Sequence, residues 1–334
     1  MKPVRVFAVA TSALLTLILL ALASGCSAKG GPASSSGATT GDSASGRTAA
    51  ATAVAGAGGV TAQVAASELI VGSNRFVLGL LDTGGTPIPD ATAHFTFYDL
   101  SSPQPVVKGE TDAAFRAPSR EAGLQEQIKV TKPDGSTKVQ LNAPSDVGVY
   151  EATVSFDHAG KWGVQSAGKL KNGREYSART SFDVTASGVT PAIGSPAPPS
   201  HNLTVKDVTD LSQIDTSVYA STDMHTESIA DGIAAGHPLL VLFATPGYCT
   251  SRFCGPELEL ARKLEPAYKG KVDFIHVEIY KDPAQRIQVD AVNEYHLPSE
   301  PWFFVIDSQG MVRAKFEGPT SIAELDAALR QLAS

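Results

Sequence analysis

Two kinds of periodicity follow one another along the chain. Between residues 64 and 186 the clearest stretches alternate apolar and polar side chains, which predicts strands with one buried and one solvent-facing side. Turn-forming sequences such as Asn172-Gly173 separate these stretches, and no helix is expected among them. The inward-facing apolar side chains are expected to be Ala93, Phe95, Phe97, Tyr150, Ala152, Val154, Phe156, Trp162, Val164, Ala178, Phe182 and Val184. About seven short strands in this region predict a β-sandwich.

Beyond residue 200 the pattern changes to strands that alternate with helices. The run 239–244 is continuously apolar, as in a strand that is buried on both faces. The expected order is helix 227–235, strand 239–244, helix 256–268, strand 272–279, helix 283–294, strand 302–306, strand 311–316 and helix 322–332. This alternation predicts an α/β domain over residues 201–334.

The N-terminus has the order of an export signal. Two basic residues precede the uncharged apolar run 6–23, and small residues then lead to Cys26, so residues 1–25 are expected to be a signal peptide. The stretch before Cys26 resembles the lipobox of bacterial lipoproteins, although Ala23 stands where the commonest pattern has leucine. The resemblance implies that Cys26 is lipidated and anchors the protein to a membrane in the cell envelope, on the extracytoplasmic side. The alternative is an uncleaved membrane anchor, for which the apolar run is nearly long enough.

Two segments have the composition of linkers. Residues 26–63 consist almost entirely of Ala, Gly, Ser, Thr and Pro after Cys26, so they are expected to form a disordered tether. Residues 187–200 are rich in proline and are expected to form a semi-rigid linker. The chain is therefore divided into a signal peptide, a tether, a sandwich over 64–186, a linker and an α/β domain.

The charge distribution argues against nucleic acid as a partner. The formal net charge is −7, and residues 191–334 contain 19 acidic against 11 basic side chains. A surface that binds phosphate groups needs clustered Lys and Arg, and the sequence contains no such cluster.

The sandwich region contains a stretch with a resemblance of its own. The sequence from Gly148 to Trp162 resembles immunoglobulin-like domains of bacterial envelope proteins. Some relatives of that fold carry copper, but His94 and His158 have no cysteine or methionine cluster near them. The domain is therefore expected to be a spacer or a binding module.

The α/β region resembles the thioredoxin fold. The resemblance rests on the cysteine loop 244–256, on the proline-containing segment 297–304 that precedes a strand, and on the closing hairpin and helix. It implies that Pro301 follows a cis peptide bond and lies beside the cysteines, with Pro298 or a trans bond as the alternatives. Glu300, just before Pro301, then lies either near the thiols, where its charge raises their pKa, or in solvent. The expected fold class is an all-β immunoglobulin-like sandwich followed by an α/β thioredoxin-like domain.

The cysteine loop departs from the family pattern. Thioredoxins have two residues between their cysteines, whereas four separate Cys249 from Cys254. In the preferred register Cys249 is the nucleophile, and in the other register Cys254 takes that place and Glu257 stands where the resolving thiol belongs. The buried acid of thioredoxins has no counterpart, because its place falls near the apolar Leu242 or Phe243.

The loop nevertheless permits a disulfide. If Pro256 is the first helical residue, Cys249 and Cys254 both precede the helix and are free of its geometry. With Cys26 lipidated, these two cysteines are the only partners for each other within the chain. The positive end of the helix is expected to lower the pKa of Cys254.

Three functions compete at this stage. The first is a membrane-tethered thiol–disulfide oxidoreductase that uses Cys249, Cys254 and Pro301 and acts on envelope thiols and disulfides or on a redox partner. The second is a copper-binding or copper-delivery protein similar to the Sco family, although the cysteine spacing differs from that family's. The third is a binding domain with an inert disulfide. The candidate copper ligands are Cys249, Cys254, Met224, His225, His276 and His296.

Overall fold

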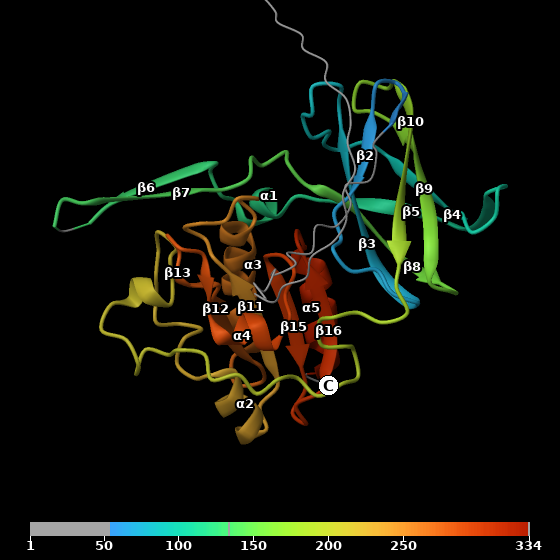
Figure 1. Ribbon diagram of the computed structural model, residues 1–334. Helices are drawn as coiled ribbons and strands as arrows, with labels where there is room; N and C mark the ends of the chain where they lie inside the picture. Colours follow the sequence, from blue (N-terminus) through green and yellow to red (C-terminus); the bar gives the residue numbers. More distant parts are fainter. Residues whose placement is uncertain (1–53, 133, 333–334) are drawn as a thin grey trace, which may run out of the picture. The chain divides into compact units, whose positions relative to one another are not determined.

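The computed structural model describes residues 54–132 and 134–332 (Figure 1). These residues belong to one compact unit, Arg47–Ser334. The expected signal peptide, Cys26 and most of the expected tether lie outside the described residues. Within the described ranges, no helix is long and apolar enough to cross a membrane.

An eight-stranded antiparallel sheet forms the first part of the described chain. Its strands are β1 (Val54–Ala57), β2 (Thr61–Val64), β3 (Gly72–Leu81), β4 (Ala93–Asp99), β5 (Val106–Arg116), β8 (Val149–Phe156), β9 (Gly160–Lys169) and β10 (Glu175–Val184). They lie in the order β1-β10-β9-β4-β5-β8-β3-β2. Strand β5 pairs with β4 through residues 106–113 and with β8 through residues 114–116, so it joins the two halves of the sheet.

Aromatic side chains fill the core of this sheet. Phe76 is fully buried, and the centroid of its ring lies between 5.0 and 5.8 Å from those of Phe95, Phe97 and Phe182. Edge-on and tilted rings at these distances are a favourable arrangement of aromatic side chains. The predicted alternation is confirmed, because all the side chains expected to face inward are buried except Val154, which is half-buried.

Two short strands lie where the sequence predicted tether. β1 pairs with β10 and β2 pairs with β3, and Val60 and Ala62 are completely buried. The expected boundary at residue 63 was therefore too late. Small side chains alone cannot drive folding, but here the neighbouring strands supply the hydrogen bonds and the apolar surface.

The segment between β5 and β8 was expected to contain no helix, and this was wrong. It forms the short helix α1 (Pro118–Ala122) and the hairpin of β6 (Gln127–Thr131) and β7 (Thr137–Leu141). Proline at the start of α1 and Gly123 at its end, with a φ of 70°, are local signals for this helix.

A four-stranded sheet forms the core of the C-terminal part, in the order β12-β11-β15-β16. Its strands are β11 (Leu239–Ala244), β12 (Asp273–Glu278), β15 (Trp302–Ile306) and β16 (Val312–Glu317), and its helices are α2 (Ile229–Ala235), α3 (Cys254–Tyr268), α4 (Asp290–Glu294) and α5 (Ile322–Leu332). β11 and β12 are parallel and are connected through α3, whereas β11–β15 and β15–β16 are antiparallel. The predicted order of strands and helices is confirmed, apart from the region of α4.

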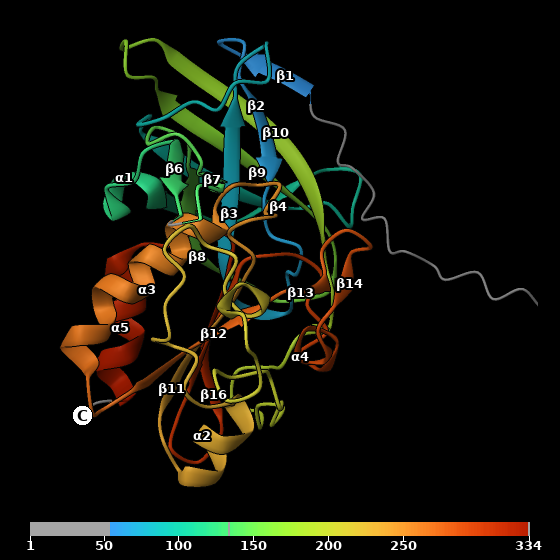
Figure 2. The ribbon, with the colours of Figure 1, turned by 90° about the vertical axis from the view of Figure 1, so that its left-hand side faces the viewer.

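Helices cover both faces of this sheet. On one face α3 and α5 lie side by side (Figure 2). Leu258 of α3 and Leu325 of α5 join Leu240 there in a buried cluster. On the other face Ile229 of α2 packs in a cluster that includes Val241. β11 is consequently buried along its whole length, as its continuous apolar run predicts.

The expected helix over 283–294 was mostly wrong. The chain first forms a small hairpin of β13 (Tyr280–Asp282) and β14 (Ile287–Gln288), and only α4 is helical. The Asp282 carboxylate accepts hydrogen bonds from the amides of Ala284 and Gln285. An aspartate that binds amides two and three residues later stabilises a turn instead of a helix.

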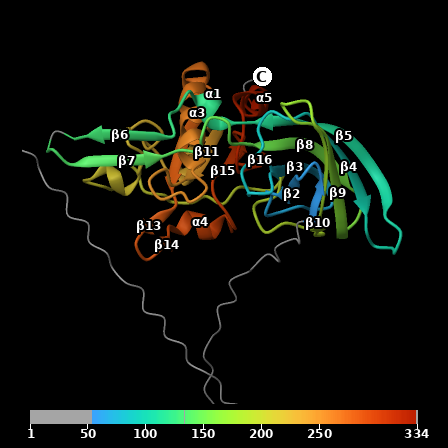
Figure 3. The same cartoon turned by 90° about the horizontal axis from the view of Figure 1, so that it is seen from above.

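The segment with α1, β6 and β7 packs beside α3 (Figure 3). Ala122 belongs to the same buried cluster as Leu258, and the amide of Ala143 donates to the carbonyl of Arg252 at 2.8 Å. An insertion between two strands of the first sheet therefore supports the cysteine loop of the second.

We expect Phe76→Ala to lower the free energy of unfolding by about 3–5 kcal/mol, because it leaves a cavity among three aromatic rings. Urea denaturation measures this change. Val107→Ala, at a side chain that is 54% exposed, is the control and is expected to change the value by less than about 0.5 kcal/mol. Equal effects of the two substitutions would contradict the assigned core.

Candidate functional site

The cysteine loop connects β11 to α3. The chain leaves β11 at Ala244 and reaches the helix at Cys254, so the expected helix start at Pro256 was two residues too late. Pro256 is accommodated in the first turn because amides there have no partner within the helix. Arg252 has a φ of 63°, and its amide bonds the carbonyl of Cys249 at 3.3 Å. This turn brings Cys249 back over the start of α3.

The two thiols lie together at the N-terminus of α3. Cys254 is fully buried and Cys249 is partly exposed. Both are free, and their sulfurs lie within 4.8 Å of each other and of a carboxylate oxygen of Glu300. The structure thus contains the dithiol form. The Cys249–Cys254 disulfide, with its bond length of about 2.0 Å, stays a prediction.

The thiol with the low pKa is Cys249, not Cys254 as expected. The pKa of Cys249 is lowered to about 6, first because its sulfur accepts a hydrogen bond from the Cys254 thiol and then because of Ser251 and the loop amides. The amide of Cys254 donates to this sulfur at 3.4 Å. The positive end of α3 therefore acts on Cys249, which lies over the helix, while Cys254 lies within it.

Burial has the opposite effect on the second thiol. It raises the pKa of Cys254 well above the usual value, and the nearby Cys249 and Glu300 raise it further. At neutral pH the site therefore holds an accessible thiolate beside a buried thiol.

Glu300 and Pro301 complete this site from the segment before β15, the strand whose first residue, Trp302, pairs with Phe243 near the end of β11. The Glu300–Pro301 peptide is cis, the isomer that the resemblance to thioredoxins implies for Pro301. Burial raises the pKa of Glu300 to about 8, and the negative charge of Cys249 and Glu278 adds to the effect. Its oxygen Oε2 is buried and has no hydrogen-bond partner. Glu300 is thus a neutral acid next to a thiolate at pH 7.

A second buried acid was not expected from the sequence. Leu242 and Phe243 are indeed apolar and buried, but Glu278 lies next to Ala244 in the register of β11 and β12. Burial raises the pKa of Glu278 to about 7. The signal was an acid between the apolar Val277 and Ile279 at the end of the expected strand 272–279, one strand away from the place where an acid was sought.

The alternative register, with Glu257 in place of a resolving thiol, finds no support. The Glu257 carboxylate is fully buried and accepts hydrogen bonds from the amide and hydroxyl of Thr320. Burial raises its pKa to about 8. The group of metal-capable side chains around the thiols, within the described residues, contains Glu300 and not Glu257.

The candidate copper ligands do not assemble around the cysteines. His225 and His276 are buried together with Asp215 in a separate cluster. Met224 is buried in the cluster of α3 and α5, and His296 is exposed. Among the described residues, no histidine belongs to the group formed by the two thiols and Glu300.

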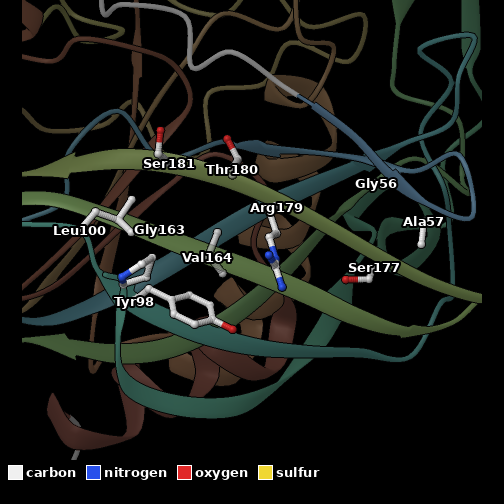
Figure 4. Close-up of a pocket in the computed structure, with 11 residues that line it drawn as sticks. Gly56, Ala57, Tyr98, Leu100, Gly163, Val164, Ser177, Arg179, Thr180 and Ser181 are labelled. Carbon is white, nitrogen blue, oxygen red and sulfur yellow. The ribbon is translucent and has the colours of Figure 1, made fainter. Parts of the chain in front are cut away.

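One cavity lies in the eight-stranded sheet, away from the cysteine loop (Figure 4). It has a volume of about 620 Å³, and Tyr98, Leu100 and Arg179 are among its lining residues. His94 and His158 do not line it, and each pairs with an aspartate, Asp112 and Asp157 respectively. The sandwich region therefore shows no histidine-based metal site among the described residues.

The chain matches no family model and no curated protein. Among solved structures it is similar to a thiol:disulfide interchange protein of the thioredoxin family from Chlorobium tepidum TLS, with 17% identity over 43% of this chain and 99% of that one, at a TM-score of 0.30. It is also similar to the PmoD soluble domain from Methylocystis sp., with 10% identity over 37% of this chain and 90% of that one, at a TM-score of 0.19. The C-terminal part is thioredoxin-like in fold. The order and directions of β12, β11, β15 and β16 carry that statement.

We expect iodoacetamide to modify Cys249 with a midpoint near pH 6, because the thiolate of this residue is the reactive species. The measurement is the rate of alkylation of the reduced protein from pH 4 to pH 9, followed by mass spectrometry. Cys249→Ser is expected to abolish rapid labelling, whereas Cys254→Ala keeps the reactive residue but loses the hydrogen bond from the Cys254 thiol, which raises the midpoint. Rapid labelling of Cys254 in the folded protein would contradict this assignment.

Proposed function

We propose that this protein is a thiol–disulfide oxidoreductase in which Cys249 is the nucleophile and Cys254 the resolving thiol. The observation that carries the proposal is the unequal pair of thiols: an accessible one with a low pKa beside a buried one with a high pKa. An inert structural disulfide needs no such difference. Pro301, in its cis peptide next to the pair, is proposed to shape the surface that receives the substrate.

The first step uses the thiolate of Cys249. It attacks one sulfur of a substrate disulfide, whose S–S bond breaks as a Cys249–substrate bond forms and one substrate thiolate leaves. Cys254 then loses its proton and attacks the sulfur of Cys249, which releases the second substrate thiolate. The protein is oxidised by two electrons to the Cys249–Cys254 disulfide and the substrate is reduced, and oxidation of a substrate follows the same steps in reverse.

The proton of Cys254 needs an acceptor, and Glu300 is proposed to be that acceptor. While Cys249 is a thiolate, its charge helps to keep Glu300 protonated. Once Cys249 is part of a mixed disulfide, this charge is gone and the Glu300 carboxylate forms more readily. The formation of the mixed disulfide therefore prepares the base that the second step requires.

The rest of the chain is proposed to place this site in the cell envelope. We infer that residues 1–25 are a lipoprotein signal peptide, that Cys26 carries the lipid, and that the small-residue segment after it is a tether. The eight-stranded sheet is proposed to be an immunoglobulin-like spacer between tether and thioredoxin-like domain. The proposed substrates of the protein are disulfides or thiols of envelope proteins.

We expect Glu300→Gln to slow the resolving step roughly 100-fold, because glutamine cannot accept the proton of Cys254. The measurement is single-turnover reduction of a model peptide disulfide, with acid quenching and mass spectrometry of the mixed disulfide. Labelling of Cys249 at pH 6 is expected to stay unchanged, since Glu300 is neutral there.

The matched control is Glu175→Gln, on an exposed residue of β10, which is expected to behave as the wild type. Cys254→Ser is expected to accumulate the mixed disulfide without resolving it. Absence of any mixed disulfide on Cys249 in that variant would contradict the oxidoreductase, whereas normal resolution by Glu300→Gln would contradict only the role of Glu300.

The anchoring proposal has a separate test. We expect Cys26→Ser to abolish incorporation of a labelled fatty acid and to release the protein from the membrane fraction, because Cys26 supplies the only thiol at the proposed cleavage site. Cys249→Ser is the control and is expected to leave labelling unchanged. Persistent labelling of Cys26→Ser would show that Cys26 is not the lipidated residue.

A further inference from the structure

Asp215, His225 and His276 form a buried cluster that the proposed redox chemistry does not use. Each side chain is at most 1% exposed. Asp215 follows the 3₁₀ turn η1 (Leu211–Gln213), His225 lies in the loop before α2, and His276 lies on β12. One ligand atom from each lies within 4.8 Å of the others. Three segments that are distant in the sequence thus bring three metal-capable groups to one point.

The hydrogen bonds of the two rings determine which nitrogens face inward. Nδ1 of His225 lies 2.8 Å from the carbonyl of Asp223, and Nε2 of His276 lies 3.1 Å from the carbonyl of Ala244. A carbonyl only accepts, so Nε2 of His276 carries the hydrogen of that ring and its Nδ1 has a lone pair. Both nitrogens of His225 face acceptors, because its Nε2 lies 2.9 Å from the carbonyl of Ile214 and 3.1 Å from Nδ1 of His276. A neutral His225 ring has only one hydrogen for these acceptors, so the cluster calls for an additional cation, which is either a second proton on His225 or a metal ion.

Oxygen atoms converge on the same point. The carbonyl oxygen of Ile214 lies 2.9 Å from Nε2 of His225, and the Asp215 carboxylate is the third member of the cluster. The two oxygens and the two ring nitrogens together supply the four donors that a tetrahedral metal ion needs. Ligand atoms around Zn²⁺ are about 3.3 Å apart, so the distances from Nε2 of His225 to Nδ1 of His276 and to the Ile214 carbonyl have to lengthen by only a few tenths of an ångström.

The charges around the cluster are mixed. Arg262 donates to Asp215 at 3.0 Å and also pairs with Glu259. Glu278 is close by, because its carboxylate accepts from the amide of Thr216, the residue after Asp215. Two of these carboxyl groups pair with the guanidinium, and the third, Glu278, can balance part of the charge of a divalent cation.

We propose that Asp215, His225, His276 and the carbonyl of Ile214 bind a zinc ion. Metal-binding histidines usually donate their second N–H to a carbonyl or carboxylate, as both rings do here. The ion would connect the segment before α2, which contains Asp215 and His225, to His276 on strand β12. That segment also contacts the cysteine loop, because the hydroxyl of Thr216 accepts from the amide of Gly247 at 2.9 Å. The zinc would thus be structural and would support the loop that carries Cys249.

The test uses a full-length chain without thiols, Cys26→Ser/Cys249→Ser/Cys254→Ser, because the thiols and Glu300 form another group that could bind zinc. The protein is refolded with Zn²⁺ and dialysed, and its metal content is measured. We expect about one zinc per chain, and X-ray absorption is expected to show imidazole and oxygen ligands. A folded protein with less than about 0.1 zinc per chain would overturn the proposal and leave a shared proton between the rings.

Two further substitutions locate the ion. Adding His276→Gln is expected to lower zinc affinity at least 10-fold. Adding His237→Gln is the matched control, because the exposed His237 belongs to a different group, with Glu227 and Asp273. This substitution is expected to leave the zinc affinity unchanged. Equal affinity in the His276→Gln protein, or loss in the His237→Gln protein, would overturn the site. The zinc content of the thiol-free parent is decisive if His276→Gln does not fold.

Discussion

The amide of Cys254 donates a hydrogen bond to the sulfur of Cys249, and the chemistry proposed for this protein depends on that contact. It exists because α3 begins at Cys254 and because the loop before it turns back over the helix. Packing of α3 against β11 holds the helix start in place. One short contact thereby gives the first cysteine the electrostatic environment of a helix N-terminus while the second is enclosed by the core.

Burial then separates the protonation states of the groups around this contact. It raises the pKa of Cys254, Glu300 and Glu278, whereas hydrogen bonds outweigh it at Cys249. At pH 7 the ionised sulfur of Cys249 is consequently accompanied by a neutral Cys254 thiol and a protonated Glu300, while Glu278 is near the midpoint of its titration. Such an arrangement moves protons over short distances without placing several negative charges together.

The first sheet contributes more than a spacer would. Its insertion between β5 and β8 packs against α3 and bonds the cysteine loop through Ala143 and Arg252. On the opposite side of that loop, Thr216 bonds Gly247. Segments that precede and follow residues 187–200 thus both bond the cysteine loop, in which Arg252 has a positive φ. This support explains how a loop with four residues between its cysteines can hold one geometry.

The sequence by itself determined the elements whose signals are local: alternating strands such as β4 and β8, the apolar run of β11, and the cysteine loop that follows it. The cis peptide before Pro301 was expected only from the resemblance to thioredoxins. Tertiary structure alone decided which thiol is acidic, because the pKa depends on burial and on an amide reached through a turn. It also decided that Glu278 lies in the site and that His225 and His276 pair with Asp215 instead of the cysteines. The physical reason is that these properties arise between residues far apart in the chain, where no periodicity or spacing records the contact.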